Sequence, residues 1–227
     1  MANIPEETPK PTHTYLAPVD ELGRPVVMGR PVPPPKKDGW RSILSTIGIL
    51  LAAPLVALLL TMFIFQSYQV DGASMQPTLH NNDRLIVWKL PRTIAKIFHR
   101  QYTPHRGDII IFTEPDLESY GQNADKQLIK RVIGLPGERV VVKDGTITVY
   151  NAEKPDGFKP DDLLPYGKTI PSTSHDGEWI VGKKQLFVSG DNRPESLDSR
   201  YFGPIDLSNV IGKLSFRVLP VGQAKHF

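Results

Sequence analysis

The sequence of 227 residues contains no cysteine. Disulfide bonds, thiolate catalysis and cysteine-based zinc sites are therefore excluded. Its six histidines are scattered, and no two of them have the His-x-x-x-His spacing of a helical zinc site. We expect neither a metal site nor a cofactor, and we interpret the histidines as solvated or capping side chains.

The sequence also lacks a strong excess of charge of either sign. It has 27 lysine and arginine residues against 24 acidic residues, a net charge of +3. Outside the N-terminal segment the charges are evenly spread, and no aromatic-basic stripe suits a single-stranded nucleic acid. We therefore expect no nucleic-acid partner.

Proline and glycine are abundant, with 22 and 18 residues. Many of them occur in pairs or near acidic residues, which favours many short strands and turns over long helices. The length suits one domain of ordinary size plus appendages. The composition therefore predicts a mainly β domain.

The first 39 residues are interrupted by nine prolines and contain few large apolar side chains. Such a segment cannot bury enough surface to fold alone, so residues 1–39 are predicted to be a disordered tail. The alternative is a polyproline ligand for a partner protein.

An uncharged apolar run follows, from Ile43 to Phe65. At about 1.5 Å per residue, a helix of this length spans the ~30 Å hydrocarbon core of a bilayer, and Pro54 is expected to kink it. A cleaved signal sequence would lie at the N-terminus instead. The sequence predicts a transmembrane helix, residues 40–66, followed by a separate domain, residues 67–227.

The orientation of this helix follows from the lysine and arginine residues within about 20 residues of each end. Only Arg84 follows the apolar run within that distance, so the tail is predicted to be cytoplasmic and the domain to lie on the outer face of the cell membrane. The basic residues before the run are Arg24, Arg30, Lys36, Lys37 and Arg41.

After the apolar run, the chain has the alternation and turn residues of short strands. Asp144-Gly145 joins two alternating stretches and predicts a hairpin. The polar segment 151–178 predicts a long loop or insertion. The predicted strands are residues 85–88, 109–112, the hairpin 140–150, 185–189 and 210–219.

Residues 90–98 mix apolar and basic side chains. They could rest on lipid headgroups, with Trp88 as an interfacial anchor, or form an ordinary surface loop. The sequence leaves both readings open.

Ser74 is a candidate nucleophile. It lies between Gly72, which allows an unusual backbone, and Pro77, which fixes one dihedral angle, so its turn is expected to be stiff. A serine hydroxyl is a poor nucleophile at neutral pH and needs a base nearby. Taken alone, Ser74 also fits a serine that only hydrogen-bonds its own turn.

Lys130 is a candidate base. It lies in an apolar stretch that ends in the rigid turn Gly134-Leu135-Pro136-Gly137. Burial would have to lower its pKa from about 10.4 to about 8, which requires roughly 3 kcal/mol of desolvation. The alternative is a lysine that extends from a strand and pairs with a carboxylate.

The segment from Gly190 to Pro204 is dense in hydrogen-bonding side chains. Such a segment forms either a tightly bonded turn or the support that orients a catalytic base.

In their order along the chain, these motifs resemble those of the bacterial type I signal peptidases, which are membrane-anchored serine proteases. The resemblance covers nearly all of the chain from residue 43 on. Its motifs are Ser74-Met75-x-Pro77-Thr78-Leu79, Arg106-Gly107-Asp108-Ile109, Lys130-Arg131-Val132-x-Gly134-x-Pro136-Gly137 and Gly190-Asp191-Asn192-Arg193-x-x-Ser196-x-Asp198-Ser199-Arg200.

The resemblance implies a role for each matching residue. Ser74 would be the nucleophile, with its backbone N–H as an oxyanion donor, and Lys130 the general base. Ser196 would hydrogen-bond the Lys130 amine. The residues of the supporting polar network would be Asp191, Asp198, Arg200 and Arg131.

Two departures from the family pattern affect these expectations. Some members have a serine as second oxyanion donor where this chain has Gly72, so the second donor is open. The short interval between Glu138 and Gly190 implies a reduced cap within residues 139–189. The implied fold is a mainly β catalytic domain of antiparallel sheets, partly open and barrel-like.

The implied activity is removal of signal peptides from exported preproteins after small residues, in the pattern Ala-x-Ala. The implied partners are these preproteins, the lipid bilayer and the secretion translocon. Alternatives are a peptidase of narrow specificity, a self-cleaving repressor domain, which the membrane anchor argues against, and an anchored β domain that binds exported partners without catalysis.

Overall fold

The structure is a computed structural model that describes residues 19–23, 39–121, 123, 126–163 and 171–227. Most of the predicted tail, residues 1–39, therefore lies outside the described residues. Two compact units, residues 1–49 and 50–227, divide the chain.

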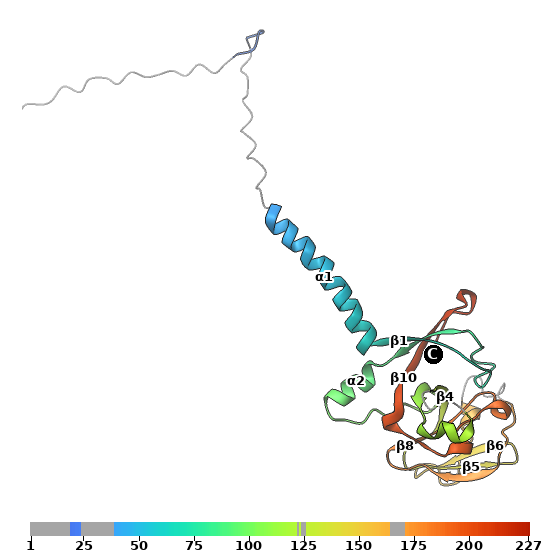
Figure 1. The fold of residues 1–227 in the computed structure, drawn as a ribbon. Coiled ribbons are helices and arrows are strands. Elements are labelled where there is room, and N and C mark those ends of the chain that lie inside the picture. The colour runs from blue at the N-terminus through green and yellow to red at the C-terminus, as the bar shows by residue number, and fades with distance from the viewer. Residues whose placement is uncertain (1–18, 24–38, 122, 124–125, 164–170) are drawn as a thin grey trace, which may run out of the picture. The chain divides into compact units, whose positions relative to one another are not determined.

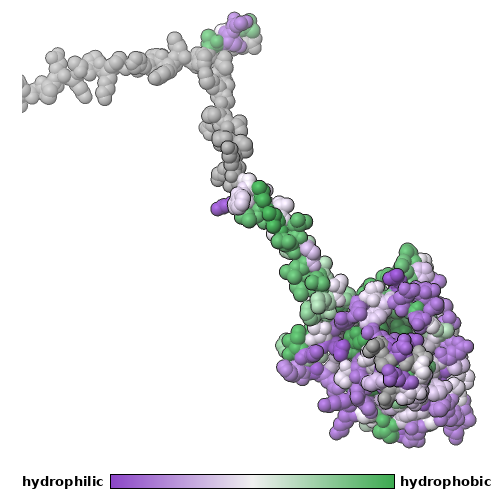
Figure 2. Space-filling view, viewed as in Figure 1, coloured by the Kyte–Doolittle hydropathy of each residue, from purple (hydrophilic) through white to green (hydrophobic). Residues whose placement is uncertain are grey.

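Helix α1, Gly39–Phe63, covers most of the predicted transmembrane segment 40–66, but Phe65 and Gln66 belong to a strand instead. It has no buried residue, and by length and composition it could cross a membrane. Its visible face is almost entirely hydrophobic (Figure 2). The Thr61 hydroxyl donates to the Ala57 carbonyl within the helix, so this polar group needs no water. The helix ends two residues before Phe65, because Phe65 begins a strand and packs its ring on Trp88.

A large antiparallel sheet makes up most of the unit formed by residues 50–227 (Figure 1). The sheet curls into a half-barrel, and β10 has irregularities in its pairing with β2 and β3. The predicted mainly β, partly open barrel-like fold is therefore confirmed. The strands, in sheet order, are β1 (Phe65–Gln69), β2 (Arg84–Trp88), β10 (Val210–Leu219), β3 (Ile109–Thr113), β4 (Gln127–Gly134), β8 (Gln185–Ser189) and β9 (Ile205–Asp206), while β11 (Lys225–His226) pairs with β10.

A small sheet has the order β6 (Thr146–Tyr150), β5 (Arg139–Lys143) and β7 (Gly177–Ile180). Asp144 and Gly145 have φ angles of 52° and 74°, as expected for the predicted hairpin turn. Val140 and Ile147 pack with Phe187 of β8, so the small sheet shares a core with the large one.

The remaining helices are short. Residues 90–97 form the helix α2, Leu90–Ile97, rather than a surface loop. The others are η1 (Pro115–Tyr120), η2 (Pro160–Leu163), η4 (Arg193–Glu195), α3 (Ser199–Phe202), η5 (Leu207–Asn209) and η6 (Val221–Gln223).

Candidate active site

The turn that carries Ser74 lies between β1 and β2 and is anchored by apolar side chains. Met75 and Leu79 are fully buried in a core cluster with Leu85 of β2. Burial of two large side chains within one turn of chain resists movement of the backbone between them. Val70, before Ser74, is buried in the same cluster, so the position of Ser74 is fixed by packing on both sides of it.

Ser74 and Lys130 line the same cleft, which has a volume of about 260 Å³. One wall is formed by the end of β1 and the Ser74 turn, and the other by the start of β4. The cleft thus lies between two segments that are distant in the sequence, since Lys130 follows Ser74 by 56 residues.

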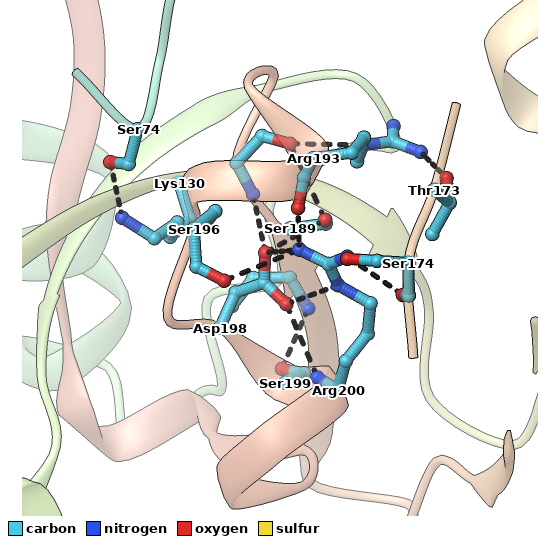
Figure 3. A network of polar contacts seen from close by, with 12 residues as sticks. Ser74, Lys130, Thr173, Ser174, Ser189, Arg193, Ser196, Asp198, Ser199 and Arg200 are labelled. Carbon is cyan, nitrogen blue, oxygen red and sulfur yellow. Dashed lines mark hydrogen bonds and ion pairs between the residues drawn. The ribbon is translucent and has the colours of Figure 1, made fainter. Parts of the chain in front are cut away.

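The two candidate residues contact each other directly. Lys130 Nζ lies 2.8 Å from Ser74 Oγ and also donates to the Ile129 carbonyl at 3.0 Å. Figure 3 shows the two side chains pointing toward each other from different segments of the chain. This distance is within the range for proton transfer between a nucleophile and its base.

Burial changes the acid-base chemistry of Lys130. Its side chain is only 3% exposed, and this desolvation lowers the pKa of Lys130 to about 8. The carboxylate of Asp198 opposes the shift, while the positive charge of Lys126 adds to it. The neutral form is therefore about one molecule in ten at pH 7, against about one in three thousand at the ordinary pKa.

Asp191 joins the Ser74 turn to β4. It accepts two hydrogen bonds from Arg131, at 2.8 and 2.5 Å, and one from the Thr78 hydroxyl at 2.5 Å. Both carboxylate oxygens of Asp191 therefore have hydrogen-bond donors, in a place where an unpaired charge would be costly. The expected supporting residues Asp191 and Arg131 thus hold the Ser74 turn in register with the strand that carries Lys130.

Asp198 and Arg200 form a second, separate network (Figure 3). Asp198 accepts from the Arg200 guanidinium at 2.8 Å, from the Ser189 hydroxyl and from the Gly190 N–H. Although burial alone would raise the pKa of Asp198, the Arg200 guanidinium holds it below its ordinary value. This network fixes the loop after β8, which lies beside the Lys130 amine.

The sequence motif assigns no role to Gly190 or Asn192, yet both residues contact the Ser74 turn. The Asn192 N–H donates to the Ser74 carbonyl at 3.0 Å, and its side chain donates to the Ala73 carbonyl at 3.2 Å. A side chain at position 190 would lie 2.4 Å from the Ser74 carbonyl oxygen. The only sequence signal was their place in the last motif, because close backbone approach leaves no local pattern.

Ser196 differs from its expected position in the network. Its hydroxyl is buried and has no hydrogen-bond partner within the described residues, and no bond joins it to Lys130 Nζ. Buried hydroxyls without a protein partner commonly bind a water molecule. The expected direct contact with the amine is therefore absent from this structure.

The oxyanion donors are only partly defined. In the described part of the chain, the backbone N–H of Ser74 has no acceptor, so it is available to a substrate carbonyl. The N–H of Gly72 donates to Asn81 Oδ1 at 3.0 Å, which removes one candidate for the second donor. No group of three or more metal-ligating side chains occurs among the described residues.

Comparison with known proteins connects this geometry to a family. Residues 42–219 match the family model described as signal peptidase, peptidase S26. The probable signal peptidase I-1 of Synechocystis sp. is 34% identical over 195 residues, which are 85% of this chain and 89% of that protein. Signal peptidase I V of Bacillus subtilis is 38% identical over 162 residues, 67% of this chain and 84% of that protein.

A solved structure of a signal peptidase I from Enterococcus faecalis V583 is 31% identical and covers 51% of this chain and 99% of that chain, with a TM-score of 0.39. The matched family model extends over most of the sequence, from within α1 to the end of β10. The chain therefore belongs to the signal peptidase family of peptidase S26.

Proposed function

We propose that this chain removes signal peptides from exported preproteins with Ser74 as the nucleophile and Lys130 as the general base. The observation that carries the proposal is the 2.8 Å contact between Ser74 Oγ and the buried Lys130 amine. A binding domain without catalysis would have no need for a lysine kept in a desolvated site, where its charge is costly.

The proposed reaction begins with the neutral amine of Lys130. The amine takes the proton of Ser74 Oγ as the oxygen attacks the scissile carbonyl carbon. The resulting ammonium gives its proton to the leaving amine, and the acyl-enzyme remains on Ser74. Lys130 then takes a proton from the water that attacks the ester and returns it to Ser74 Oγ, which leaves as a free hydroxyl and releases the signal peptide.

The proposed oxyanion site uses the backbone N–H of Ser74. Asn192 supports this role, because it holds the Ser74 carbonyl and thereby the orientation of the adjacent peptide groups. Fixed N–H donors stabilise the charge that develops in the transition state. The second donor is left to a bound water or another N–H, since Gly72 carries no hydroxyl.

The substrate is proposed to bind as an extended strand in the cleft. β1 is at the edge of the large sheet. On the other wall, residues 127–130 of β4 pair with β3, whereas pairing with β8 begins only at Arg131. Both walls therefore offer unpaired backbone groups, which a peptide can use by strand addition. The family resemblance adds the expected preference for small residues in the pattern Ala-x-Ala.

The proposed location is the outer face of the cell membrane, with α1 as the anchor and residues 1–39 as a cytoplasmic tail. The basic residues before α1 support this orientation. Within this arrangement residues 40–66 would be the membrane segment and 67–227 the peptidase domain, with its short cap within 139–189. Since the preprotein is also held in the bilayer, tethering raises the effective concentration of both, and the secretion translocon is a further proposed partner.

The function is tested with the full chain reconstituted in vesicles that contain a preprotein with an Ala-x-Ala signal end. We expect one cut, directly after the second alanine, identified by mass spectrometry of the product. A preprotein with leucine at that alanine should be cut at least about 100-fold more slowly, because the side chain does not fit a small pocket. A Ser74→Ala chain serves as the control for contaminating proteases.

Cleavage at an unrelated position, or equal cutting of both preproteins, contradicts the proposed specificity. If only one of many exported preproteins is cut, the chain is a narrow-specificity maturation peptidase. Cleavage by the Ser74→Ala chain at the wild-type rate removes Ser74 from the mechanism.

The pH dependence of cleavage follows from the neutral form of Lys130. We expect the rate to rise with pH, to reach half of its maximum close to the Lys130 pKa of about 8, and to level off above that pH. Lys126→Gln should move this midpoint upward, because it removes a positive charge that lowers the pKa of Lys130. The measurement is kcat/KM between pH 6 and 10, which covers about two pH units on each side of the Lys130 pKa. A flat profile, or a downward shift in the variant, argues against Lys130 as the base.

A further inference from the structure

Helix α2 presents an apolar stripe to solvent. Ile94 and Ile97 lie on one side of the helix, since residues three or four apart share a face. Both are exposed, as are Phe98 directly after the helix and Trp88 directly before Lys89. α2 itself has no buried residue, so this apolar surface is not used in packing. We call Trp88, Ile94, Ile97 and Phe98 the α2 stripe.

The charge around the α2 stripe has one sign. Residues 84–107 include six lysine and arginine residues and no aspartate or glutamate. Lys96 and Arg100 are exposed near the stripe, and Arg92, four residues before Lys96, donates to the Ser208 carbonyl at 2.9 Å. An apolar stripe bordered by basic residues is the pattern of a helix that lies in the surface of an anionic bilayer.

α2 is attached to the C-terminal end of α1. The Lys89 N–H donates to the Ile64 carbonyl at 2.8 Å, and Lys89 Nζ donates to the Met62 carbonyl at 3.0 Å. The Thr93 hydroxyl donates to the Phe63 carbonyl at 3.1 Å. These bonds satisfy carbonyl groups that the end of a helix leaves without partners. The start of α2 is therefore held at the C-terminal end of α1.

We propose that α2 is a second membrane contact of the protein, an interfacial helix whose α2 stripe enters the headgroup region of an anionic phospholipid bilayer. The proposal rests on the proposed spanning role of α1, because the bonds to residues 62–64 place α2 at the level where that helix meets the headgroups. Lys96 and Arg100 contribute attraction to anionic lipid, and Trp88 is an aromatic side chain of the type enriched at this depth.

This contact fixes the orientation of the catalytic cleft. β1 follows α1 directly, and β2, its partner in the sheet, leads into α2. Both strands are therefore tied to the membrane surface at the same end. Since Ser74 follows the start of β1 by nine residues of at most about 3.3 Å each, the Ser74 turn is held within roughly 30 Å of that surface.

The test uses the absence of cysteine from the chain. Single cysteines are introduced in the full-length protein by Ile97→Cys, Ile180→Cys and Leu55→Cys, and each is labelled with an environment-sensitive fluorophore. Ile97 and Ile180 are both 65% exposed, but Ile180 lies on β7 of the small sheet, so it is a matched control. The proteins are reconstituted in vesicles of phosphatidylglycerol and phosphatidylcholine, with and without a quencher attached to the lipid acyl chains.

We expect the quencher to reduce emission at positions 97 and 55 by about half or more and to leave position 180 unchanged. Quenching at 55 with none at 97 overturns the proposal and points to a protein partner for the α2 stripe. No quenching at 55 contradicts the spanning role of α1, which is a failure of the proposed function instead. Equal quenching at 97 and 180 also overturns the proposal, because it shows no preference for α2.

A second measurement concerns activity. Ile97→Glu should slow cleavage of a preprotein embedded in vesicles by about tenfold, because a charged side chain resists entry into the interface. Cleavage of a short soluble peptide in detergent should not change, and Ile180→Glu should affect neither reaction. Equal rates of the Ile97→Glu chain and wild type on the embedded preprotein contradict the proposal.

Discussion

Replacing Lys130 with methionine should lower the rate of preprotein cleavage by about three orders of magnitude or more, since it removes the proposed base for Ser74. Methionine has a similar length and no charge, so it fills the buried site without a new cavity. The measurement is a single-turnover rate on reconstituted preprotein at pH 8, close to the Lys130 pKa of about 8. Lys184→Met is the control, because Lys184 is an exposed lysine in the turn before β8.

The same variant should be more stable than the wild type at neutral pH. Burial lowers the pKa of Lys130 to about 8, from the value of 10.5 that applies to an exposed lysine. Below pH 8 the Lys130 amine is protonated in both the folded and the unfolded wild type. The folded chain then bears the full desolvation cost of this buried charge, roughly 3 kcal/mol. Between pH 8 and 10.5 the folded chain loses this proton while the unfolded chain keeps it, so the free energy of unfolding of the wild type increases with pH.

The melting temperature of Lys130→Met should therefore exceed that of the wild type at pH 7, and the difference should shrink as the pH rises. A variant that is inactive but also unstable at pH 7 contradicts the assignment of a desolvated amine. A variant that cleaves at the wild-type rate removes Lys130 from the proposed mechanism altogether.

Gly190→Ala is expected to have the second largest effect. The new Cβ would lie 2.2 Å from Ser196 Oγ and 2.4 Å from the Ser74 carbonyl oxygen. The Ser196 hydroxyl can rotate away, but the Ser74 carbonyl belongs to the backbone of a turn that Met75 and Leu79 anchor. To reach ordinary contact, the turn must move by about 1 Å, and a displacement of that size costs about 100-fold in rate.

The expected result is a loss of about 100-fold in kcat, together with about 1 to 3 kcal/mol of stability lost to overpacking. The measurements are kcat on the reconstituted preprotein and the free energy of unfolding in denaturant. Gly222→Ala is the matched control, because nothing lies within 4 Å of its added Cβ and the change should alter neither quantity. Wild-type activity in Gly190→Ala would show that the nucleophile turn moves freely, against its proposed rigid position.

Local sequence patterns predicted much of the fold. The strands predicted at 185–189 and 210–219 agree with β8 and β10, and the Asp144-Gly145 turn joins β5 and β6 as expected. The apolar run, most of which lies in α1, predicted a helix from its own length and composition. These features depend on side-chain alternation, turn conformation and segment length, all of which act within a few neighbouring residues.

Residues 90–98 show where local pattern reasoning stops. The alternation of apolar and basic residues was compatible with a loop or a membrane-resting segment. The bonds from Lys89 and Thr93 to residues 62–64 hold the start of this helix. Those partners are some 30 residues earlier in the chain, as the separation between Thr93 and Phe63 shows. The sequence pattern contains no record of such contacts.

The sequence by itself determined the residue types of the site, namely a serine in a turn expected to be stiff and a lysine in an apolar stretch. Only the tertiary structure decided that these two side chains lie 2.8 Å apart, that Asp191 pairs with Arg131 while Asp198 pairs with Arg200, and that Ser196 does not reach the amine. The physical reason is that propensity and turn chemistry are local, whereas the distance between residues 74 and 130 depends on the curl of the sheet and on core packing around the turn.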